Sequence, residues 1–392
     1  MISVQVAVYY DKGYFSFLEN YVIRYGIMLR ADLLNELLNF LKQEPEKLDV
    51  TVMPDFFYDR IISLNCNADI FSSLITGITR RKGGSIDGIE QTDIRGGNAI
   101  NTASALAALG VNVTPIVCTN KLGLHQIKFY LKKYGVDFTH VKIAAKASLT
   151  TALELNTESG KANIMLRELG SLADFGPSYL TDGDYELIEN ADFVCLFNWA
   201  GTKKHGTTLA ETVFGRVKTK GKGKTYYDTA DPLPNKDKIP ELVRRVLKTR
   251  SMDALSVNEN EAVCYASLLD RNISEQREKR TFDDLALDAA RVLAKNLSAR
   301  VDLHTTVFSA TFNGKNEVVV PAFKVEALRA TGAGDSWNAG NILAEASALS
   351  DECRLALANA VAAYFLSDQK GLHPTRRKLA RLVEGAAKVR SC

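Results

Sequence analysis

The 392-residue sequence has few of the features that mark membrane, secreted or nucleic-acid-binding proteins. It contains no run of about 18 apolar residues, so no transmembrane helix is expected. Its first residues, MISVQVAVYYDKGYF, lack the basic segment and apolar core of a signal peptide. The formal net charge of +3 argues against a dedicated nucleic-acid binder. We therefore expect a protein with neither a membrane nor a nucleic acid as partner.

Cysteine and histidine are also scarce. Six scattered cysteines form no C-x-x-C pair, and five histidines show no metal-ligand spacing. This favours reduced, incidental thiols in a cytoplasmic protein over a disulfide framework or a zinc site.

The remaining composition, 46% hydrophobic and 24% charged residues, is typical of a globular protein with a sizeable core. Strand patterns alternate with helical patterns of about 10 to 15 residues along most of the chain. This predicts an α/β fold: a doubly wound, mainly parallel sheet with helices on both faces. Segments at about 63–95 and 148–170 do not follow that rhythm and predict a small separate β-sheet. Within them, SSLITGITRRKGGSIDGIEQTDI (72–94) is expected to form strands and polar turns.

Residues 1–48 precede this pattern and are treated as an N-terminal extension of a main domain at 49–392. In RADLLNELLNFLKQE, apolar residues recur at helical spacing at Leu33, Leu37, Leu38 and Leu41. We expect an amphipathic helix that packs on the main domain or on a partner.

The stretch ATGAGDSWNAG (330–340) carries the clearest chemical signal. It lacks the lysine of a P-loop, and Trp337 stands where a dinucleotide fingerprint needs its third glycine. Amides at the start of a helix would instead form an anion cradle, with the Asp335 carboxylate at its mouth. A carboxylate base beside such a cradle is what phosphoryl transfer to a hydroxyl requires. A turn that merely caps a helix is the alternative.

Two motifs together resemble the signatures of the ribokinase or PfkB family of carbohydrate and nucleoside kinases. ATGAGDSW is similar to the C-terminal signature, and GGNAINTASALAALG (96–110) to the N-terminal one. The resemblance covers about residues 50–392. It implies a doubly wound domain with a small β-sheet lid over the acceptor, and a homodimer formed through that lid. It further implies Asp335 as general base and an anion hole made by the four residues before it: Thr331, Gly332, Ala333 and Gly334.

The same resemblance implies an acceptor site. The family binds acceptor hydroxyls with an aspartate at the end of its first strand, for which Asp59 fits better than Asp55 in MPDFFYDRI. Further acceptor contacts are expected from the Gly-Gly turn and the helix after it: Gly96, Gly97, Asn98 and Asn101.

The nucleotide side of the site is expected around NENE. Its Asn258 and Glu261 match an N-x-x-E motif that would hold the hydration shell of Mg²⁺, although Asn258 could equally be a helix N-cap. Asp228, after the strand KTYYD, resembles another aspartate of the family. Ser309 and Ala310 stand where the family usually has a glycine near the nucleotide, so the phosphate donor could be ATP or ADP.

The acceptor itself is open. Arg95 and Arg167 flank elements that face the acceptor in the family and would suit a phosphate, with solvated lid charges as the alternative. The extension and basic lid resemble an archaeal branch with ribose-1-phosphate kinases and nucleoside kinases. Ribose 1-phosphate is therefore favoured over cytidine, adenosine, fructose 6-phosphate or a plain sugar. Two other classes of function are alternatives: a non-catalytic sugar- or nucleotide-sensing module, and an oxidoreductase with a disguised dinucleotide site.

Overall fold

The structure is a computed structural model that describes residues 31–45, 47–158, 160–275, 280–314, 316–329 and 331–388. Ala330, the first residue of the glycine-rich stretch, and residues 1–30 of the extension lie outside the described part.

The centre of the molecule is an eight-stranded sheet with the order β14-β13-β12-β11-β10-β9-β1-β4. The six strands from β12 to β4 are parallel, and β13 and β14 are added as an antiparallel edge. The predicted mainly parallel α/β fold is therefore confirmed. The strands are β1 (Asp49–Met53), β4 (Asn112–Pro115), β9 (Phe193–Phe197), β10 (Lys224–Asp228), β11 (Ala254–Asn258), β12 (Arg300–His304), β13 (Phe308–Asn313) and β14 (Asn316–Pro321).

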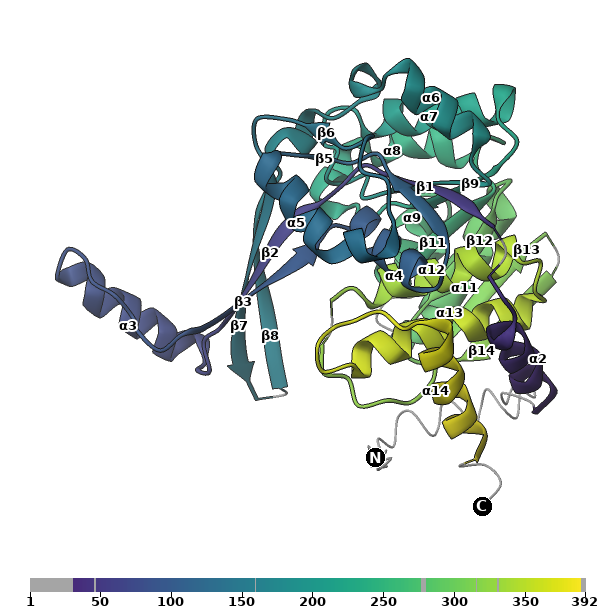
Figure 1. Cartoon of the computed structure of the whole chain (residues 1–392). Coiled ribbons are helices and arrows are strands. Elements are labelled where there is room, and N and C mark those ends of the chain that lie inside the picture. The colour runs from purple at the N-terminus through teal and green to yellow at the C-terminus, as the bar shows by residue number, and fades with distance from the viewer. Residues whose placement is uncertain are drawn as a thin grey trace.

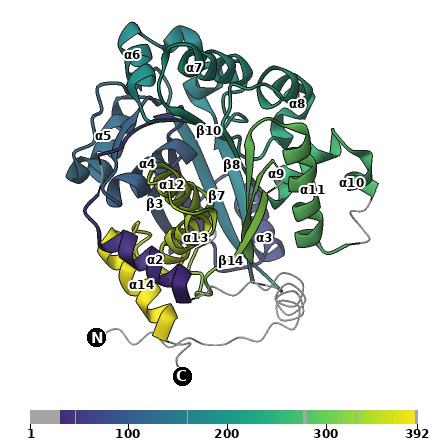
Figure 2. The same cartoon turned by 90° about the vertical axis from the view of Figure 1, so that its right-hand side faces the viewer.

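Helices cover both faces of this sheet, because buried strands alternate their side chains between two apolar cores (Figure 2). Val52 and Met53, neighbours on β1, point into different cores. One layer consists of α2 (Ala31–Lys42), α4 (Asn98–Ala108), α5 (Lys121–Leu131), α12 (Ala333–Ala346), α13 (Asp351–Ser367) and α14 (Arg376–Lys388). The other contains α6 (Asp182–Asn190), α7 (Gly206–Lys220), α8 (Ile239–Leu242), α9 (Glu259–Ser267), α10 (Arg271–Glu275) and α11 (Phe282–Asn296).

The predicted amphipathic helix near the N-terminus is α2. It buries Leu33, Leu34, Leu37, Phe40 and Leu41. These side chains pack on α13 and α14 of the same chain (Figure 2). In the described part of the extension, the helix therefore serves the main domain.

A second, four-stranded sheet projects from the body (Figure 1). Its order is β3-β2-β7-β8, with β2 (Phe57–Ser63), β3 (Glu90–Gly96), β7 (Ser148–Thr157) and β8 (Gly160–Glu168). We call it the lid sheet. The predicted segments contain β3, β7 and β8 but omit most of β2. A short pair, β5 (Cys118–Thr119) and β6 (Lys142–Ile143), lies at its base.

The expectation of strands and turns across 72–94 is wrong for its first half. Residues Ala68–Arg80 form helix α3, which lies beyond the far end of the lid sheet (Figure 1). The Asn67 side chain accepts a hydrogen bond from the Ile70 amide, which caps the helix. Apolar residues then recur every three or four positions, and this spacing outweighs the β-propensity of the individual isoleucines and threonines. Among the described helices, none is long and apolar enough to cross a membrane.

Candidate active site

The glycine-rich stretch forms the N-terminus of α12, which lies on the sheet beside α4. Gly332 is the N-cap and has a φ of 86°, a conformation that favours glycine. A Cβ at this position would also come within 3.1 Å of the Phe365 ring. Thr331 and Gly332 thus lead into α12, which begins with Ala333 and Gly334 and whose first amides have no acceptor within the helix. This is the local geometry of an anion site.

Asp335 lies in the first turn of α12 and is only 6% exposed. Its two carboxylate oxygens accept hydrogen bonds from the Asn98 and Asn101 side chains at 2.8 and 2.9 Å. Burial raises the pKa of Asp335 to about 7, against the lowering effect of the Asn101 hydrogen bond. The structure therefore brings both predicted asparagines onto the predicted base.

The two asparagines are presented by the start of α4, where the chain passes through the Gly-Gly turn. Gly97 has a φ of 90°, and a Cβ there would lie 2.8 Å from the Phe56 Cα. The Asp55 carboxylate accepts hydrogen bonds from the Asn98 and Ala99 amides at 2.9 and 2.8 Å, which caps the helix. Asp55, the less favoured sequence choice for an acceptor ligand, is thus fully buried beneath the site.

The sequence predicts Asp59 at the end of the first strand. In the structure it does not lie there. The chain turns after β1, and Asp59 sits within β2 of the lid sheet. Its carboxylate packs directly over Gly96, where a Cβ would collide with it. Burial raises the pKa of Asp59 to about 6, partly offset by a hydrogen bond from Thr150 and by Arg167. Asp59 therefore remains next to the Gly-Gly turn, but it is carried by the lid.

The two arginines proposed for an acceptor phosphate are not brought together. Strand register pairs Asp59 with Thr150, and Thr150 with Arg167, so these three side chains share one face of the lid sheet. The Arg167 guanidinium lies 5.1 Å from the Phe57 ring centroid on that face.

Arg95 is paired instead with Tyr58, on the opposite face of the lid sheet. It donates to a ring nitrogen of His373 at 3.0 Å and lies 5.5 Å from the centroid of the Tyr130 ring. Arg95 and Arg167, the two candidates for an acceptor phosphate, therefore lie on opposite faces of the lid sheet. The period-2 alternation of strands separates them.

Asn258 and Glu261 form a reciprocal capping box at the start of α9. The Asn258 side chain accepts from the Glu261 amide at 3.0 Å, and the Glu261 carboxylate accepts from the Asn258 amide at 3.0 Å. The N-cap alternative for Asn258 is thus realised. Across the described residues, no three His, Cys, Asp or Glu side chains form a metal-binding group.

The same two residues still fit a hydrated Mg²⁺ held through its waters. Glu261 is 3% exposed, and burial together with the nearby carboxylates Asp228 and Asp231 raises its pKa well above the usual value. A divalent cation would relieve this accumulation of negative charge. The Asn258 side-chain amide donates a hydrogen bond to the Glu261 carboxylate. The two side chains therefore suit contacts to the waters of a hydrated Mg²⁺ better than direct ligation of the ion.

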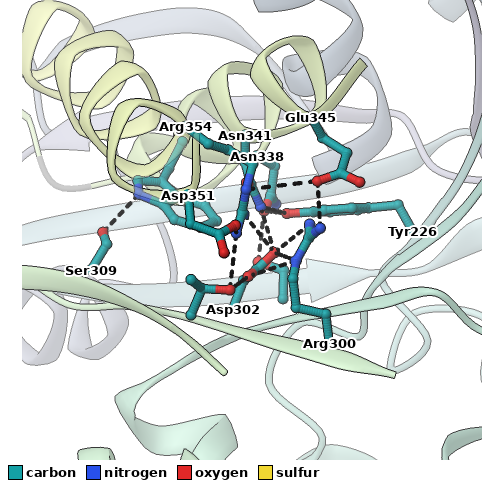
Figure 3. A network of polar contacts seen from close by, with 12 residues as sticks. Tyr226, Arg300, Asp302, Ser309, Asn338, Asn341, Glu345, Asp351 and Arg354 are labelled. Atoms are coloured by element: carbon teal, nitrogen blue, oxygen red, sulfur yellow. Dashed lines mark hydrogen bonds and ion pairs between the residues drawn. The ribbon is translucent and has the colours of Figure 1, made fainter. Parts of the chain in front are cut away.

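A buried polar network, which the sequence reasoning missed, holds α12 from behind (Figure 3). Asn338, three residues after Asp335, donates to Asp228 at 2.6 Å and accepts from the Tyr226 hydroxyl at 2.7 Å. Thus the Asp228 carboxylate serves to anchor α12. The signal available in the sequence was the recurrence of polar residues every three positions along the helix: Asp335, Asn338 and Asn341.

The network continues to an ion pair below α12. Asn341 donates to Asp302 at 2.9 Å, and Arg354 of α13 donates to Asn341 at 2.5 Å and to Asp302 at 3.2 Å (Figure 3). Burial alone would raise the pKa of Asp302, but Arg300 and Arg354 hold it below its usual value. Two strands and two helices are thereby fixed relative to one another beneath the site.

Ser309 and Ala310 lie inside β13 and are fully buried. The Ser309 hydroxyl accepts from the Trp337 indole at 2.8 Å, so it also anchors α12. His304, a second residue that sequence reasoning missed, lies beside the anion-site turn. Its ring is 3.2 Å from where a Gly334 Cβ would be, and its Nε2 is buried without a hydrogen-bond partner.

Comparisons with known proteins agree with this geometry. The pfkB family carbohydrate kinase model matches residues 74–376. Among solved structures, the adenosine kinase from Sinorhizobium meliloti is similar, with 17% identity, 88% of this chain and 99% of that chain covered, and a TM-score of 0.64. The Arabidopsis thaliana ribokinase is 18% identical, with 86% of this chain and 99% of that chain covered and a TM-score of 0.63. The Methanocaldococcus jannaschii nucleoside kinase is 16% identical, with 87% of this chain and 100% of that chain covered and a TM-score of 0.60.

The fold and the family match together define a phosphotransferase that acts on a hydroxyl group. The chain belongs to the pfkB family of carbohydrate kinases. The ribokinase-like resemblance drawn from the two glycine-rich motifs is thereby confirmed.

Proposed function

We propose that this protein transfers a phosphoryl group from ATP or ADP to a hydroxyl of a ribose-based acceptor, with ribose 1-phosphate as the favoured substrate. The observation that carries the proposal is Asp335, a buried carboxylate with a pKa raised to about 7 at the N-terminus of a helix. A base whose pKa lies near neutral pH is well matched to general-base catalysis. The solved Arabidopsis ribokinase is described as complexed with ribose and ATP, and a Cryptococcus neoformans ribokinase with ADP.

In this mechanism Asp335 accepts the proton of the acceptor hydroxyl. Asn98 and Asn101 fix the orientation of its carboxylate through one hydrogen bond each. The amides at the start of α12, following Thr331 and Gly332, stabilise negative charge on the transferring group. Asn258 and Glu261 would hold a hydrated Mg²⁺ through its waters, and the bound cation would supply positive charge that offsets the negative charge of the nucleotide phosphates.

The lid sheet supplies the acceptor contacts. The Asp59 carboxylate packs over Gly96, next to the Gly-Gly turn, and would accept hydrogen bonds from acceptor hydroxyls. Arg167, on the same face, is the favoured ligand for an acceptor phosphate, because a guanidinium can bind phosphate with two parallel hydrogen bonds. Arg95 is assigned a packing role against His373 and Tyr130.

A coupled kinase screen tests the proposal. ATP, ADP and GTP would each be combined with ribose 1-phosphate, ribose, cytidine, adenosine and fructose 6-phosphate in the presence of Mg²⁺. We expect turnover with ribose 1-phosphate and its loss in Asp335→Asn, with nucleotide binding retained in both proteins. Turnover with a nucleoside alone would establish the nucleoside-kinase alternative. Nucleotide binding without turnover on any acceptor would favour the non-catalytic sensing module.

A further inference from the structure

Arg329 carries a charge that no carboxylate balances. It lies two residues before Thr331, where the anion-site turn begins. Its side chain is partly buried, and its Nε makes no hydrogen bond. Within the described part of the chain, no Asp or Glu side chain forms an ion pair with it. Removing a guanidinium from water is costly, so other groups must stabilise this charge.

The groups that hold the charge lie at the end of α13. The Arg329 guanidinium donates to the backbone carbonyl of Asp368, which is the C-cap of that helix. It also lies 5.4 Å from the centroid of the Phe365 ring. Carbonyls at a helix C-terminus carry a partial negative charge, and the face of an aromatic ring attracts a cation. Both contacts therefore favour a positive charge at this place.

The loop after α13 is shaped around the guanidinium. Gly371 has a φ of 64°, which favours glycine, and a Cβ there would collide with Nη1 of Arg329. The Gly371 amide donates to the same Asp368 carbonyl at 3.1 Å. The Asp368 carboxylate accepts hydrogen bonds from the Lys370 and Leu372 amides, which closes the loop. The fold thus provides a fitted place for a planar cation.

The same contacts fasten the chain directly before the anion-site turn. The Leu328 amide donates to the Leu366 carbonyl at 2.9 Å, so two successive residues, Leu328 and Arg329, are tied to the end of α13. The Phe365 ring that faces the guanidinium also lies 3.1 Å from where a Cβ of Gly332 would be. Loss of the Arg329 side chain would therefore free both the entry to the turn and the ring against which Gly332 packs.

We propose that Arg329 is a positioning residue for phosphoryl transfer. Its guanidinium, held at the end of α13, keeps the amides of residues 331–334 where they stabilise the transferring group beside Asp335. Arg329 acts through the turn, since its own donors are directed to the end of α13. The amides act on charge that develops in the transition state, so loss of Arg329 should lower kcat more than it changes KM. The inference rests on the transfer step proposed above.

The first test compares the steady-state kinetics of Arg329→Ala and Arg376→Ala on the acceptor that the kinase screen identifies. Arg376 is a matched control, because it donates to the Phe40 and Gln43 carbonyls and lies 4.5 Å from the centroid of the Phe40 ring, next to α2. We expect Arg329→Ala to lower kcat about 10- to 100-fold, as for a catalytic group displaced by about 1 Å, with both KM values within about twofold. Arg376→Ala should reduce thermal stability but leave kcat unchanged.

The second test restores the missing group. In Arg329→Ala, guanidinium added at a concentration too low to unfold the protein should recover part of kcat. Urea has nearly the same size and shape but no charge. It should recover none, because the helix C-terminus and the ring favour a cation. Arg329→Lys keeps the charge but lacks the planar group, so its kcat should lie between those of the unchanged protein and the alanine variant.

A third measurement does not require turnover. The amides of Leu328 and Ser336, on either side of the turn, donate hydrogen bonds to backbone carbonyls. Their hydrogen exchange therefore reports whether the turn is held in place. Exchange at both amides should be faster in Arg329→Ala than in the unchanged protein, and Arg376→Ala should not alter it.

Three results would overturn the proposal. The first is a kcat of Arg329→Ala within about twofold of that of the unchanged protein. The second is an equal loss of kcat in Arg376→Ala, and the third is recovery by urea as complete as by guanidinium. Absence of turnover on every acceptor in the unchanged protein would instead count against the proposed function. Unaltered hydrogen exchange in Arg329→Ala would then overturn the role of Arg329 by itself.

Discussion

Replacing Asp335 by asparagine should stabilise the protein at neutral pH, and by an amount that depends on pH. Burial raises the pKa of this carboxyl from 3.8 to about 7. The folded state therefore holds a proton that the unfolded state releases as the pH rises above about 4. Stability falls through this interval and becomes level above pH 7. At about 1.36 kcal/mol for each pKa unit, the total loss is roughly 4 kcal/mol.

Asparagine is nearly isosteric with aspartate but cannot ionise. The variant therefore does not lose stability between about pH 4 and pH 7 through ionisation at this position. Its other titratable groups are those of the unchanged protein, and a difference between the two proteins therefore isolates Asp335. The assay is urea unfolding of both proteins at half-unit steps between pH 4 and 8.5. We expect the variant to gain stability relative to the unchanged protein steadily up to pH 7. A difference that stays constant with pH would refute the idea that the folded state raises the pKa of Asp335.

Three further predictions concern the surroundings of the base. Asn101→Ala removes a hydrogen bond that lowers the pKa of Asp335, so the rising limb of kcat/KM against pH should move up from about pH 7 by about one unit. Arg354→Met removes a buried partner of Asp302, and chemical denaturation should show a loss of about 3 kcal/mol or more in the free energy of unfolding. Arg167→Ala should raise KM for a phosphorylated acceptor at least about tenfold but change KM for an unphosphorylated one little, whereas Arg95→Ala should not discriminate between them.

Each has an outcome that contradicts it. An unmoved pH profile in Asn101→Ala would mean that Asp335 does not set the rising limb. Full stability of Arg354→Met would mean that Arg300 alone satisfies the Asp302 carboxylate. Equal effects of Arg167→Ala on both kinds of acceptor would remove its phosphate role. Lys236→Ala, on a surface turn away from the lid sheet, is a control that should leave all three measurements unchanged.

Burial between two elements distant in sequence raises the pKa of Asp335. The N-terminus of α12 supplies the carboxyl, and the start of α4 supplies two hydrogen-bond donors that partly offset the rise. The polar network behind α12 holds this arrangement, since Asn338 ties the helix to Asp228 on the neighbouring strand β10. A substitution in that network would therefore change the position of Asp335, although none of the substituted residues contacts the substrate.

Local patterns determined much of this protein from the sequence alone. The alternation of strands and helices specified the parallel sheet, because each βαβ unit is a short-range structure with one favoured hand. The two glycine-rich stretches located Asp335, Asn98 and Asn101, because glycine at a helix start is required by backbone geometry that can be read locally. The N-cap role of Asn258 was likewise one of the two alternatives that the sequence indicated.

Only the tertiary structure decided matters of face and distance. Arg95 and Arg167 are both near the acceptor site in sequence terms, but strand register puts them on opposite faces of the lid sheet. The network around Arg354 joins residues up to 128 positions apart, from Tyr226 to Arg354, and no local pattern encodes such pairings. Whether an apolar stripe is buried is also a tertiary property: α2 and α3 both carry such stripes, and within the described residues α2 buries its stripe whereas α3 does not.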